Sequence, residues 1–232
     1  MIDWHSHILP AMDDGSRNLD ESIEMLRSLM HQGVDTVIAT PHFYANEESV
    51  EEFLSRRRES CEQLCANKTD CDIRIVCGAE VRYYPGISRM EELKKLAIEQ
   101  TNLLLLEMPM ARWTESVVHE LVELANMRGL KIIMAHIERY FALQNRKTFD
   151  MLIENGILMQ VNSSFFERIG TRKKAIDLLE TGYVHFIGSD CLNTTTRPPK
   201  IAPAYDMIRK KLGEDFVFQM VGYGYRVLEH KT

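Results

Sequence analysis

The sequence lacks a long hydrophobic segment and an excess of basic residues. Its longest apolar run lies around residues 103–106 and is far too short to cross a bilayer, so we expect no membrane insertion. The first residues show neither a basic lead nor a long apolar stretch, so we expect no signal peptide. The formal net charge of −6 argues against a nucleic-acid-binding surface, which normally carries a basic stripe.

Cysteine is also scarce, and the loops that bind nucleotide phosphates are missing. The five cysteines form no C-x-x-C pair, which predicts reduced thiols and a cytoplasmic protein. Cys61 and Cys65 lie one helical turn apart, with Cys71 and Cys77 downstream, and either a soft-metal site or inert thiols would explain them. No G-x-G-x-x-G motif follows the first apolar run and no Walker-type loop occurs, which disfavours a nucleotide-binding sheet.

What the sequence does contain is a series of short apolar runs, each ending in a polar residue. Such runs are typical of buried parallel strands, and they cover residues 1–7, 35–42, 73–80, 102–109, 131–139, 158–164 and 184–190. Segments with helical apolar spacing separate them. We expect helices over residues 19–33, 47–67, 87–100, 113–129, 146–156, 165–182 and 201–230, with a break near Gly170 in the sixth and one or two helices in the last.

This alternation predicts parallel strands joined by right-handed crossovers, in a single α/β domain spanning residues 1–232. In an open doubly wound sheet, ligands would converge only near a switch point. Polar groups that follow nearly every strand can meet at one centre only if the strands close into a ring. We therefore predict a distorted seven-stranded (β/α)7 barrel of the TIM type, with its site at the C-terminal ends of the strands.

Most of these strand ends carry an imidazole or a carboxylate. The side chains that we predict to bind metal are His5, His7, Asp14, His42, Glu80, Glu107, His136 and Asp190. His5 and His7 alternate by two, so both rings point to the same side of an extended chain. Asp13 and Asp14 lie in a DDG turn, where turn chemistry would also account for them. Nitrogen and oxygen ligands suit manganese, iron or zinc, and this number of ligands favours two or three ions that activate a water.

Two arginines follow strand ends and predict chemistry on a phosphate group. Arg139 and Arg197 have guanidinium groups that could pair with phosphate oxygens, although surface salt bridges would also explain them. We predict that these two residues and Asp14 are catalytic. We further predict that the arginines bind substrate together with Asn162 and Ser163, which follow the sixth apolar run. The pattern as a whole indicates a metal-dependent hydrolase.

The motifs HSH, DDG, TPH, GAE, LLEMP, AHIERY, QVNSS, SD and RPP resemble, in order and spacing, the polymerase-and-histidinol-phosphatase (PHP) superfamily. The resemblance is greatest to bacterial manganese-dependent tyrosine-protein phosphatases of the CpsB/YwqE type and extends from residue 1 to about residue 205. It implies the PHP barrel fold and hydrolysis of phosphotyrosine by a metal-activated water. It also implies a substrate, the tyrosine-rich tail of a cytoplasmic bacterial tyrosine autokinase that controls capsule or exopolysaccharide synthesis.

The resemblance also implies a ligand set for each ion. The first ion would be held by His5, His7, Glu80 and Asp190. The second would be held by Glu80, Glu107 and His136. The third would use Asp14, His42 and a histidine two residues after the Asp190 position. This chain has Leu192 at that last position, so we expect a weakened third site beside two intact ones.

Other functions remain open at this point. One is a small-molecule phosphoesterase, such as a histidinol-phosphate phosphatase. Another is a degenerate member that binds phosphotyrosine without hydrolysing it. Cysteine-based chemistry would need a thiolate in an arginine-rich phosphate loop; Cys191 has a suitable position, but we expect metal chemistry instead. The sequence does not indicate the metal's identity or the oligomeric state.

Overall fold

The computed structural model describes residues 1–127 and 129–229. Its strands form two hydrogen-bonded sheets in which every pair is parallel. One sheet has the order β1 (Ile2–Ser6), β2 (Thr36–Ala39) and β4 (Arg74–Cys77). The other has the order β3 (His42–Phe43), β5 (Glu80–Arg82), β6 (Leu103–Glu107), β7 (Lys131–Met134), β8 (Leu158–Asn162) and β9 (Phe186–Gly188).

The described residues thus contain nine strands, and the predicted count of seven is not confirmed. The difference arises because two of the predicted strands are each divided. Residues 40–41 separate β2 from β3, and residues 78–79 separate β4 from β5. Pro41 has no N–H to give to a ladder, and the N–H of Gly78 reaches back to the carbonyl of Ala39 at 2.8 Å. Pairing then resumes between His42 and Glu80.

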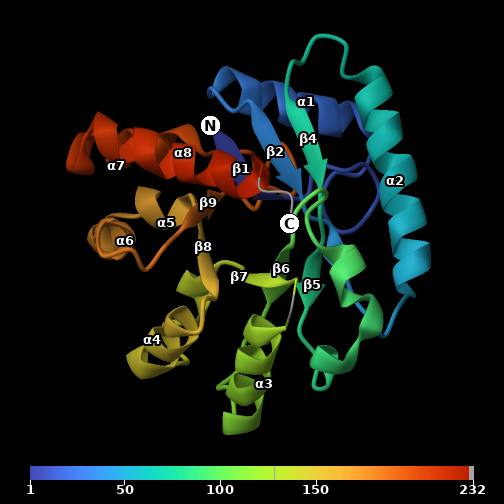
Figure 1. Ribbon diagram of the computed structural model, residues 1–232. Helices are drawn as coiled ribbons and strands as arrows, with labels where there is room; N and C mark the ends of the chain where they lie inside the picture. Colours follow the sequence, from blue (N-terminus) through green and yellow to red (C-terminus); the bar gives the residue numbers. More distant parts are fainter. Residues whose placement is uncertain (128, 230–232) are drawn as a thin grey trace.

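The parallel sheet is curled, so the first and last strands lie next to each other. The N–H of Asp190 donates to the carbonyl of His5 at 2.8 Å, and the N–H of His7 donates to that of Cys191 at 3.0 Å. These bonds join the ends of β1 and β9. Figure 1 shows the helices around the outside of the strands. The predicted α/β class with parallel strands is therefore confirmed, and the strands form a curled sheet.

Most predicted helices are present, and side-chain caps begin several of them. They are α1 (Leu19–His31), α2 (Val50–Asn67), α3 (Glu115–Asn126), α4 (Arg146–Glu154), α5 (Ser164–Glu167), α6 (Ile169–Glu180), α7 (Ala202–Leu212) and α8 (Glu214–Glu229). Asn18 caps α1, and Ser49 forms a capping box with Glu52 at the start of α2. The predicted ends of two helical segments include residues 128 and 230, which lie outside the described residues.

Two helix predictions are wrong. Residues 87–100 form two 3-10 turns, η1 (Ile87–Arg89) and η2 (Glu91–Leu96), rather than one α-helix. Glu120 of α3 accepts the N–H groups of Gly86 and Ser88, both at 3.1 Å, and so fixes the segment in a tighter turn. The break expected at Gly170 falls instead at Arg168, which is extended with φ −73° and ψ 127°, and α6 continues through the glycine.

The buried apolar side chains form two clusters, a large one and a smaller one. β6 is buried over all five of its residues, as expected for a strand covered on both faces. In the smaller cluster, the rings of Trp4 and Phe186 stack with centroids 3.9 Å apart, and Tyr223 of α8 stacks on Phe186. This packing fixes β1, which carries His5, against β9, which precedes Asp190. Among the described residues, no helix is long and apolar enough to cross a membrane.

Candidate metal centre

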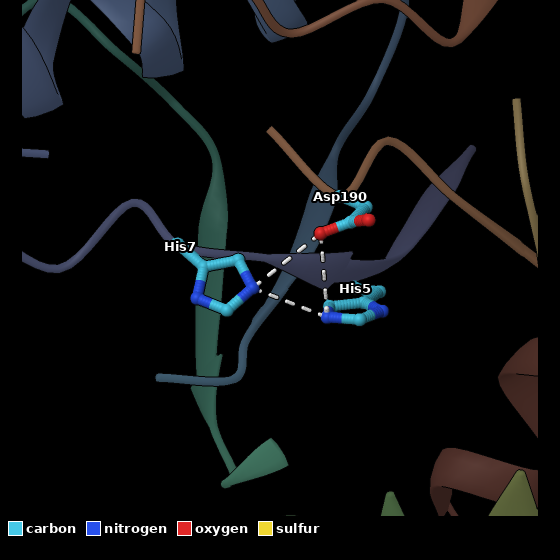
Figure 2. A group of neighbouring side chains, drawn as sticks. All are labelled: His5, His7 and Asp190. Atoms are coloured by element: carbon cyan, nitrogen blue, oxygen red, sulfur yellow. Dashed lines mark hydrogen bonds and ion pairs between the residues drawn. The ribbon is translucent and has the colours of Figure 1, made fainter. Parts of the chain in front are cut away.

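The two histidines of β1 and the loop after it face one ion-sized position, together with the aspartate that follows β9. Nε2 of His5 lies 3.2 Å from Nε2 of His7. Oδ1 of Asp190 lies 3.8 Å from the first of these nitrogens and 3.5 Å from the second. All three side chains are almost completely buried. Figure 2 shows them converging, as the predicted spacing of two along a strand requires.

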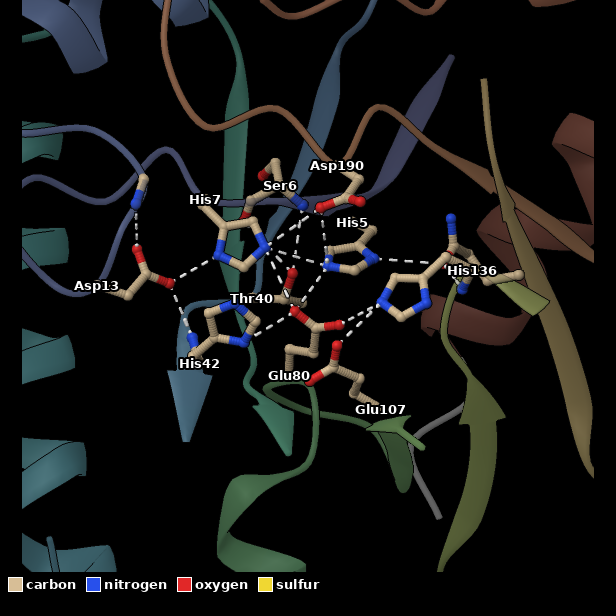
Figure 3. Close-up of polar contacts among 12 residues, drawn as sticks. His5, Ser6, His7, Asp13, Thr40, His42, Glu80, Glu107, His136 and Asp190 are labelled. Carbon is tan, nitrogen blue, oxygen red and sulfur yellow. Dashed lines mark hydrogen bonds and ion pairs between the residues drawn. The ribbon is translucent and has the colours of Figure 1, made fainter. Parts of the chain in front are cut away.

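Glu80, the first residue of β5, lies at the centre of the site and contacts four histidines. Its Oε2 lies 3.1 Å from Nε2 of His5 and 3.4 Å from Nε2 of His7. The same oxygen lies 3.1 Å from Nδ1 of His42. Its other oxygen, Oε1, lies 2.8 Å from Nε2 of His136. A carboxylate with imidazole nitrogens around both oxygens is suited to bridging two cations (Figure 3).

The remaining predicted ligands extend this cluster in two directions. Oε1 of Glu107 lies 3.7 Å from Nε2 of His136. Oδ1 of Asp14 lies 3.6 Å from Nε2 of His42, and its carboxylate is the most exposed of the set. In all, the structure brings the eight predicted ligands into four overlapping groups whose ligand atoms lie within 4.8 Å of one another: His5–His7–Asp190, His5–Glu80–His136, His7–Asp14–His42 and His42–Glu80–Glu107.

The charges in this cluster fit cations. Burial opposes ionisation of Glu80 and Asp190, but the nearby charge of His5 and hydrogen bonds from the histidines outweigh it, so the pKa of each carboxyl is lowered. Burial lowers the pKa of His7, but Asp13, Asp190 and Glu80 together outweigh it, and the net pKa is raised. Buried carboxylates that draw positive charge onto a buried imidazole form a site that would be stabilised by metal ions.

Unpaired nitrogen on His42 gives a second indication of a metal site. Nδ1 of His42 is buried and has no hydrogen-bond partner among the described residues, although it lies 3.1 Å from Oε2 of Glu80. A nitrogen and an oxygen at this separation without hydrogen-bond geometry can both direct lone pairs at one cation. The donor set contains only imidazoles and carboxylates, which suits divalent ions such as manganese, iron or zinc.

Backbone geometry supports the same centre. His136 and Asp190 both have left-handed backbone, with φ of 33° and 51°, which is rare for residues other than glycine and recurs at functional sites. Gly188 allows β9 to approach His5 closely, because a Cβ there would lie 2.5 Å from the Cβ of His5. Gly15 does the same for His7, with a Cβ 2.4 Å from the histidine Cβ. Larger residues at either glycine would displace a histidine.

Several residues that orient the ligands were missed by the sequence-based prediction. Asp13, interpreted as a turn residue, accepts a 2.6 Å hydrogen bond from Nδ1 of His7, which leaves Nε2 of that ring facing the cluster. Gln160 accepts the N–H of His136 at 2.7 Å, and its oxygen lies 3.3 Å from Nδ1 of His5. Gln160 precedes Asn162 by two residues on β8, so strand alternation could have revealed it.

The two predicted phosphate-binding arginines lie beside the cluster and converge on Asp190. Arg139 donates to Oδ2 of Asp190. Nη2 of Arg197 forms an ion pair with the same oxygen at 2.5 Å and donates to the backbone carbonyl of Asp190 at 2.8 Å. The side-chain amide of Asn162 also donates to Oδ2 at 2.6 Å, and Ser163 donates to the carbonyl of Lys200. The arginine side chains remain 34% and 40% exposed, so part of each guanidinium is open to a ligand.

A cavity of about 510 Å³ adjoins these arginines. Its walls include the predicted substrate-binding residues and further charged and aromatic side chains: Glu138, Arg139, Asn162, Ser163, Phe165, Arg168, Asp190, Arg197 and Lys200. The cavity therefore touches the cluster at Asp190 and extends away from it along α5 and α6. Its size suits a group larger than phosphate alone.

Cysteine-based chemistry was disfavoured on the premise that no C-x5-R motif occurs, and that premise is wrong. Cys191 and Arg197 are separated by five residues, the C-x5-R spacing of cysteine-dependent phosphatases. The structure argues against that chemistry. Cys191 is 0% exposed, and burial raises the pKa of its thiol to about 12. A buried neutral thiol is a poor nucleophile. The expectation of metal chemistry at this strand end is thus favoured by the geometry.

Leu192, which stands where the resemblance implies a histidine, lies at the edge of the site. Leu192 is 9% exposed, and its N–H donates to the carbonyl of Arg197 at 3.0 Å. It offers no ligand atom, as expected. His7 instead joins Asp14 and His42 in the outermost ligand group. A weakened third site therefore stays a prediction.

The chain is similar to known proteins along most of its length. Residues 1–224 match the family described as "Capsular polysaccharide synthesis, CpsB/CapC". The chain is 31% identical to tyrosine-protein phosphatase YwqE of Bacillus subtilis (strain 168), over 100% of this chain and 93% of the relative. It is 35% identical to tyrosine-protein phosphatase CpsB of Streptococcus pneumoniae, over 92% and 91% of the two chains.

A solved structure gives the same result for the fold. It comes from the crystal structures of YwqE from Bacillus subtilis and CpsB from Streptococcus pneumoniae, described as unique metal-dependent tyrosine phosphatases. The match has a TM-score of 0.87 and 29% sequence identity, and it covers 100% of this chain and 96% of the other. The predicted family is therefore confirmed, and the chain belongs to the CpsB/CapC family of capsular polysaccharide synthesis.

Proposed function

We propose that the protein is a metal-dependent protein-tyrosine phosphatase, a hydrolase of phosphoric monoesters. The observation that carries this proposal is the position of Glu80, which links four histidines at the centre of overlapping ligand groups. Two partly exposed arginines and a cavity of about 510 Å³ lie next to that cluster. Relatives at 31% and 35% identity are tyrosine-protein phosphatases, which supports phosphotyrosine as the substrate.

The ligands divide into sets that we propose for two or three ions, with manganese as the expected metal and iron or zinc as alternatives. The first set is His5, His7, Glu80 and Asp190. The second is Glu80, Glu107 and His136. The third is Asp14 and His42, with His7 within reach. When bound, such ions supply a water of lowered pKa as the nucleophile and charge that stabilises the phosphoryl group.

The chain's own residues would bind and orient the substrate. We propose that the free donors of Arg139 and Arg197 bind phosphate oxygens, because guanidinium forks match that geometry. Asn162 holds Asp190 in place, and Ser163 shapes the cavity wall by its bond to the carbonyl of Lys200. We also propose Asp14 as a catalytic residue, since its carboxylate is 65% exposed and lies 3.6 Å from Nε2 of His42.

We further propose the biological setting that the family implies. The substrate would be the phosphotyrosine tail of a cytoplasmic bacterial tyrosine kinase that controls capsule or exopolysaccharide synthesis. The five free thiols support a cytoplasmic location. For the fold, we propose one domain over residues 1–232. Counting the divided strands β2–β3 and β4–β5 as one position each gives a distorted seven-position (β/α)7 barrel.

Metal stripping and restoration would test the activity. We expect phosphate release from a phosphotyrosine peptide to disappear after chelation and dialysis and to return with manganese. Faster turnover of histidinol phosphate than of the peptide would favour a small-molecule phosphoesterase. Peptide binding without phosphate release, in manganese and at high protein concentration, would indicate a degenerate member.

The variant Leu192→His would test the third site. We expect the wild type to lose one ion more readily than the others under mild chelation, and the variant to retain it and to turn over faster. Metal content should be measured by elemental analysis at each chelator concentration. Equal resistance of three ions in the wild type, or an unchanged rate and metal content in Leu192→His, would contradict the weakened site.

A further inference from the structure

The cavity beside the two arginines has an outer part that the proposed function does not use. Arg139 and Arg197 line the cavity where it meets Asp190, whereas Arg168 and Lys200 line it along the junction of α5 with α6 and the chain before α7. Phosphate held by the first two arginines would fill only a fraction of about 510 Å³, because pockets of about 300–1,000 Å³ accommodate ligands of drug size. The outer part therefore has room for peptide residues next to a phosphotyrosine.

One wall of the cavity contains a hydrogen-bond acceptor without a partner. Oε1 of Glu138 accepts the N–H of Asn162 at 3.3 Å, whereas Oε2 is buried and unpaired among the described residues. An unpaired buried carboxylate oxygen is costly, and a ligand in the cavity can supply the missing donor. This wall favours a ligand that carries N–H groups, such as a peptide, over a bare phosphate.

The elbow between α5 and α6 fixes the backbone of Arg168 at the cavity. Arg168 is extended between the two helices. Oγ1 of Thr171 donates to the carbonyl of Phe165 at 2.7 Å, and Nε of Arg172 donates to the carbonyl of Phe166 at 3.1 Å. These side-chain bonds join the first turn of α6 to α5. The backbone at Arg168 is thus held in place while its side chain stays exposed.

The outer part of the cavity is positively charged, although the whole chain has a net charge of −6. Arg168 and Lys200 line it together with one carboxylate, that of Glu167. Nζ of Lys200 lies 3.8 Å from Oε2 of Glu167, and the two side chains are 59% and 30% exposed, so this ion pair is weak. No carboxylate of the described part of the chain pairs with Arg168. The two cations are therefore not neutralised by the protein itself.

We propose that Arg168 and Lys200 bind an acidic side chain of the substrate, a carboxylate near the phosphotyrosine in the same peptide. The inference rests on the proposed function, because it takes the phosphate to be held by Arg139 and Arg197. The carboxylate would pair with a guanidinium and an ammonium at the exposed end of the cavity. This contact is equal in the ground state and the transition state, so it lowers KM and leaves kcat unchanged.

A set of phosphotyrosine peptides would test the site, each with one glutamate at a different position and neutral residues elsewhere. With the manganese-loaded protein, we expect glutamate at one position or two adjacent positions to raise kcat/KM about 1.5- to 5-fold over the neutral peptide. The gain should appear in KM and shrink at high salt.

Charge reversal would show whether Arg168 reads this residue. We expect Arg168→Glu to prefer a lysine over a glutamate at the position that the wild type favours. The comparison is between two peptides in one variant, so a change in overall activity cancels. Lys173→Glu is the matched control, since Lys173 is exposed on the same helix and does not line the cavity. It should keep the preference for glutamate.

The same peptides with a non-hydrolysable phosphonate in place of the phosphate give Kd by calorimetry without turnover. We expect the same order of preference in each variant. Equal KM and Kd for all peptides in the wild type, an unchanged preference in Arg168→Glu, or the same reversal in Lys173→Glu would overturn the proposal. Absence of turnover for every phosphotyrosine peptide would instead overturn the proposed function, and phosphonate binding would still decide the question of the acidic residue.

Discussion

Asp13 holds His7 by a hydrogen bond of 2.6 Å from Nδ1, and the same carboxylate oxygen accepts the N–H of His42 at 2.8 Å. One aspartate outside the ligand groups thus positions two histidines inside them. Its other oxygen accepts the N–H of Gly15 at 2.9 Å, which fixes the loop that carries Asp14. Carboxylates in this role determine which ring nitrogen faces the metal and raise its basicity.

Asp13→Asn should therefore weaken metal binding without removing a ligand. We expect a loss of about 10- to 100-fold in metal affinity or activity, because a neutral amide orients the imidazole less strongly. Metal titration and phosphate release would measure it. Asp70→Asn is the matched control, since that side chain is 79% exposed and pairs with the exposed Arg27 at 3.5 Å. Equal metal affinity in Asp13→Asn and the wild type would contradict the assigned role.

Gly188→Ala tests the close approach of β9 to His5. The added Cβ would lie 2.5 Å from the Cβ of His5 and 2.8 Å from its backbone nitrogen. We expect a loss of about 1–3 kcal/mol in the free energy of unfolding, together with reduced metal content. Gly170→Ala in α6 meets nothing within 4 Å and should be neutral or stabilising by about 0.5–1 kcal/mol. Urea unfolding would measure the free energy of unfolding of both variants. Similar values would contradict steric crowding between residue 188 and His5.

Arg197→Lys tests phosphate binding. A lysine keeps the positive charge but loses the fork that reaches both Asp190 and a phosphate oxygen. We expect a fall of about 10- to 100-fold in kcat/KM, and weaker competitive inhibition by inorganic phosphate. The control is Arg146→Lys, whose side chain is 80% exposed on α4. Unchanged inhibition by phosphate would assign Arg197 to holding Asp190 alone.

His185 should make the fold sensitive to mild acid. Burial lowers the pKa of His185 to about 4, and its Nδ1 accepts the N–H of Met159 at 3.1 Å, so the folded state keeps the ring neutral. The unfolded chain has a pKa of about 6.5. The stabilisation is therefore complete above that value and is lost as the pH falls toward 4. Between pH 6.5 and 5, the contribution is about 2 kcal/mol.

Comparison with His185→Gln isolates the contribution of His185 protonation to stability, because an amide oxygen can still accept the Met159 N–H. The free energy of unfolding should fall more steeply with acidity in the wild type than in the variant between pH 6.5 and 5. Denaturant curves at several pH values provide the measurement. Parallel pH dependences would show that another group dominates in this range.

Strand-end chemistry could be predicted locally because a buried apolar run makes an ionisable end residue conspicuous. The runs ending at His42, Glu80, Glu107 and His136 each predicted a ligand, and the structure places all four around one cluster. The helix at 87–100 failed because Glu120, distant in sequence, takes N–H groups that an α-helix would have used differently. Rules based on sequence periodicity do not include hydrogen bonds to a side chain as distant as Glu120.

The α/β alternation, the family and the candidate metal ligands could be predicted from the sequence alone, since these depend on local periodicity and residue type. Which atoms meet depends on the packing of the whole chain. Asp13 reaches His7, and both arginines converge on Asp190, because strands and helices far apart in the sequence pack together. Hydrogen bonds and ion pairs depend on distances of a few ångströms, and packing of the whole chain sets those distances.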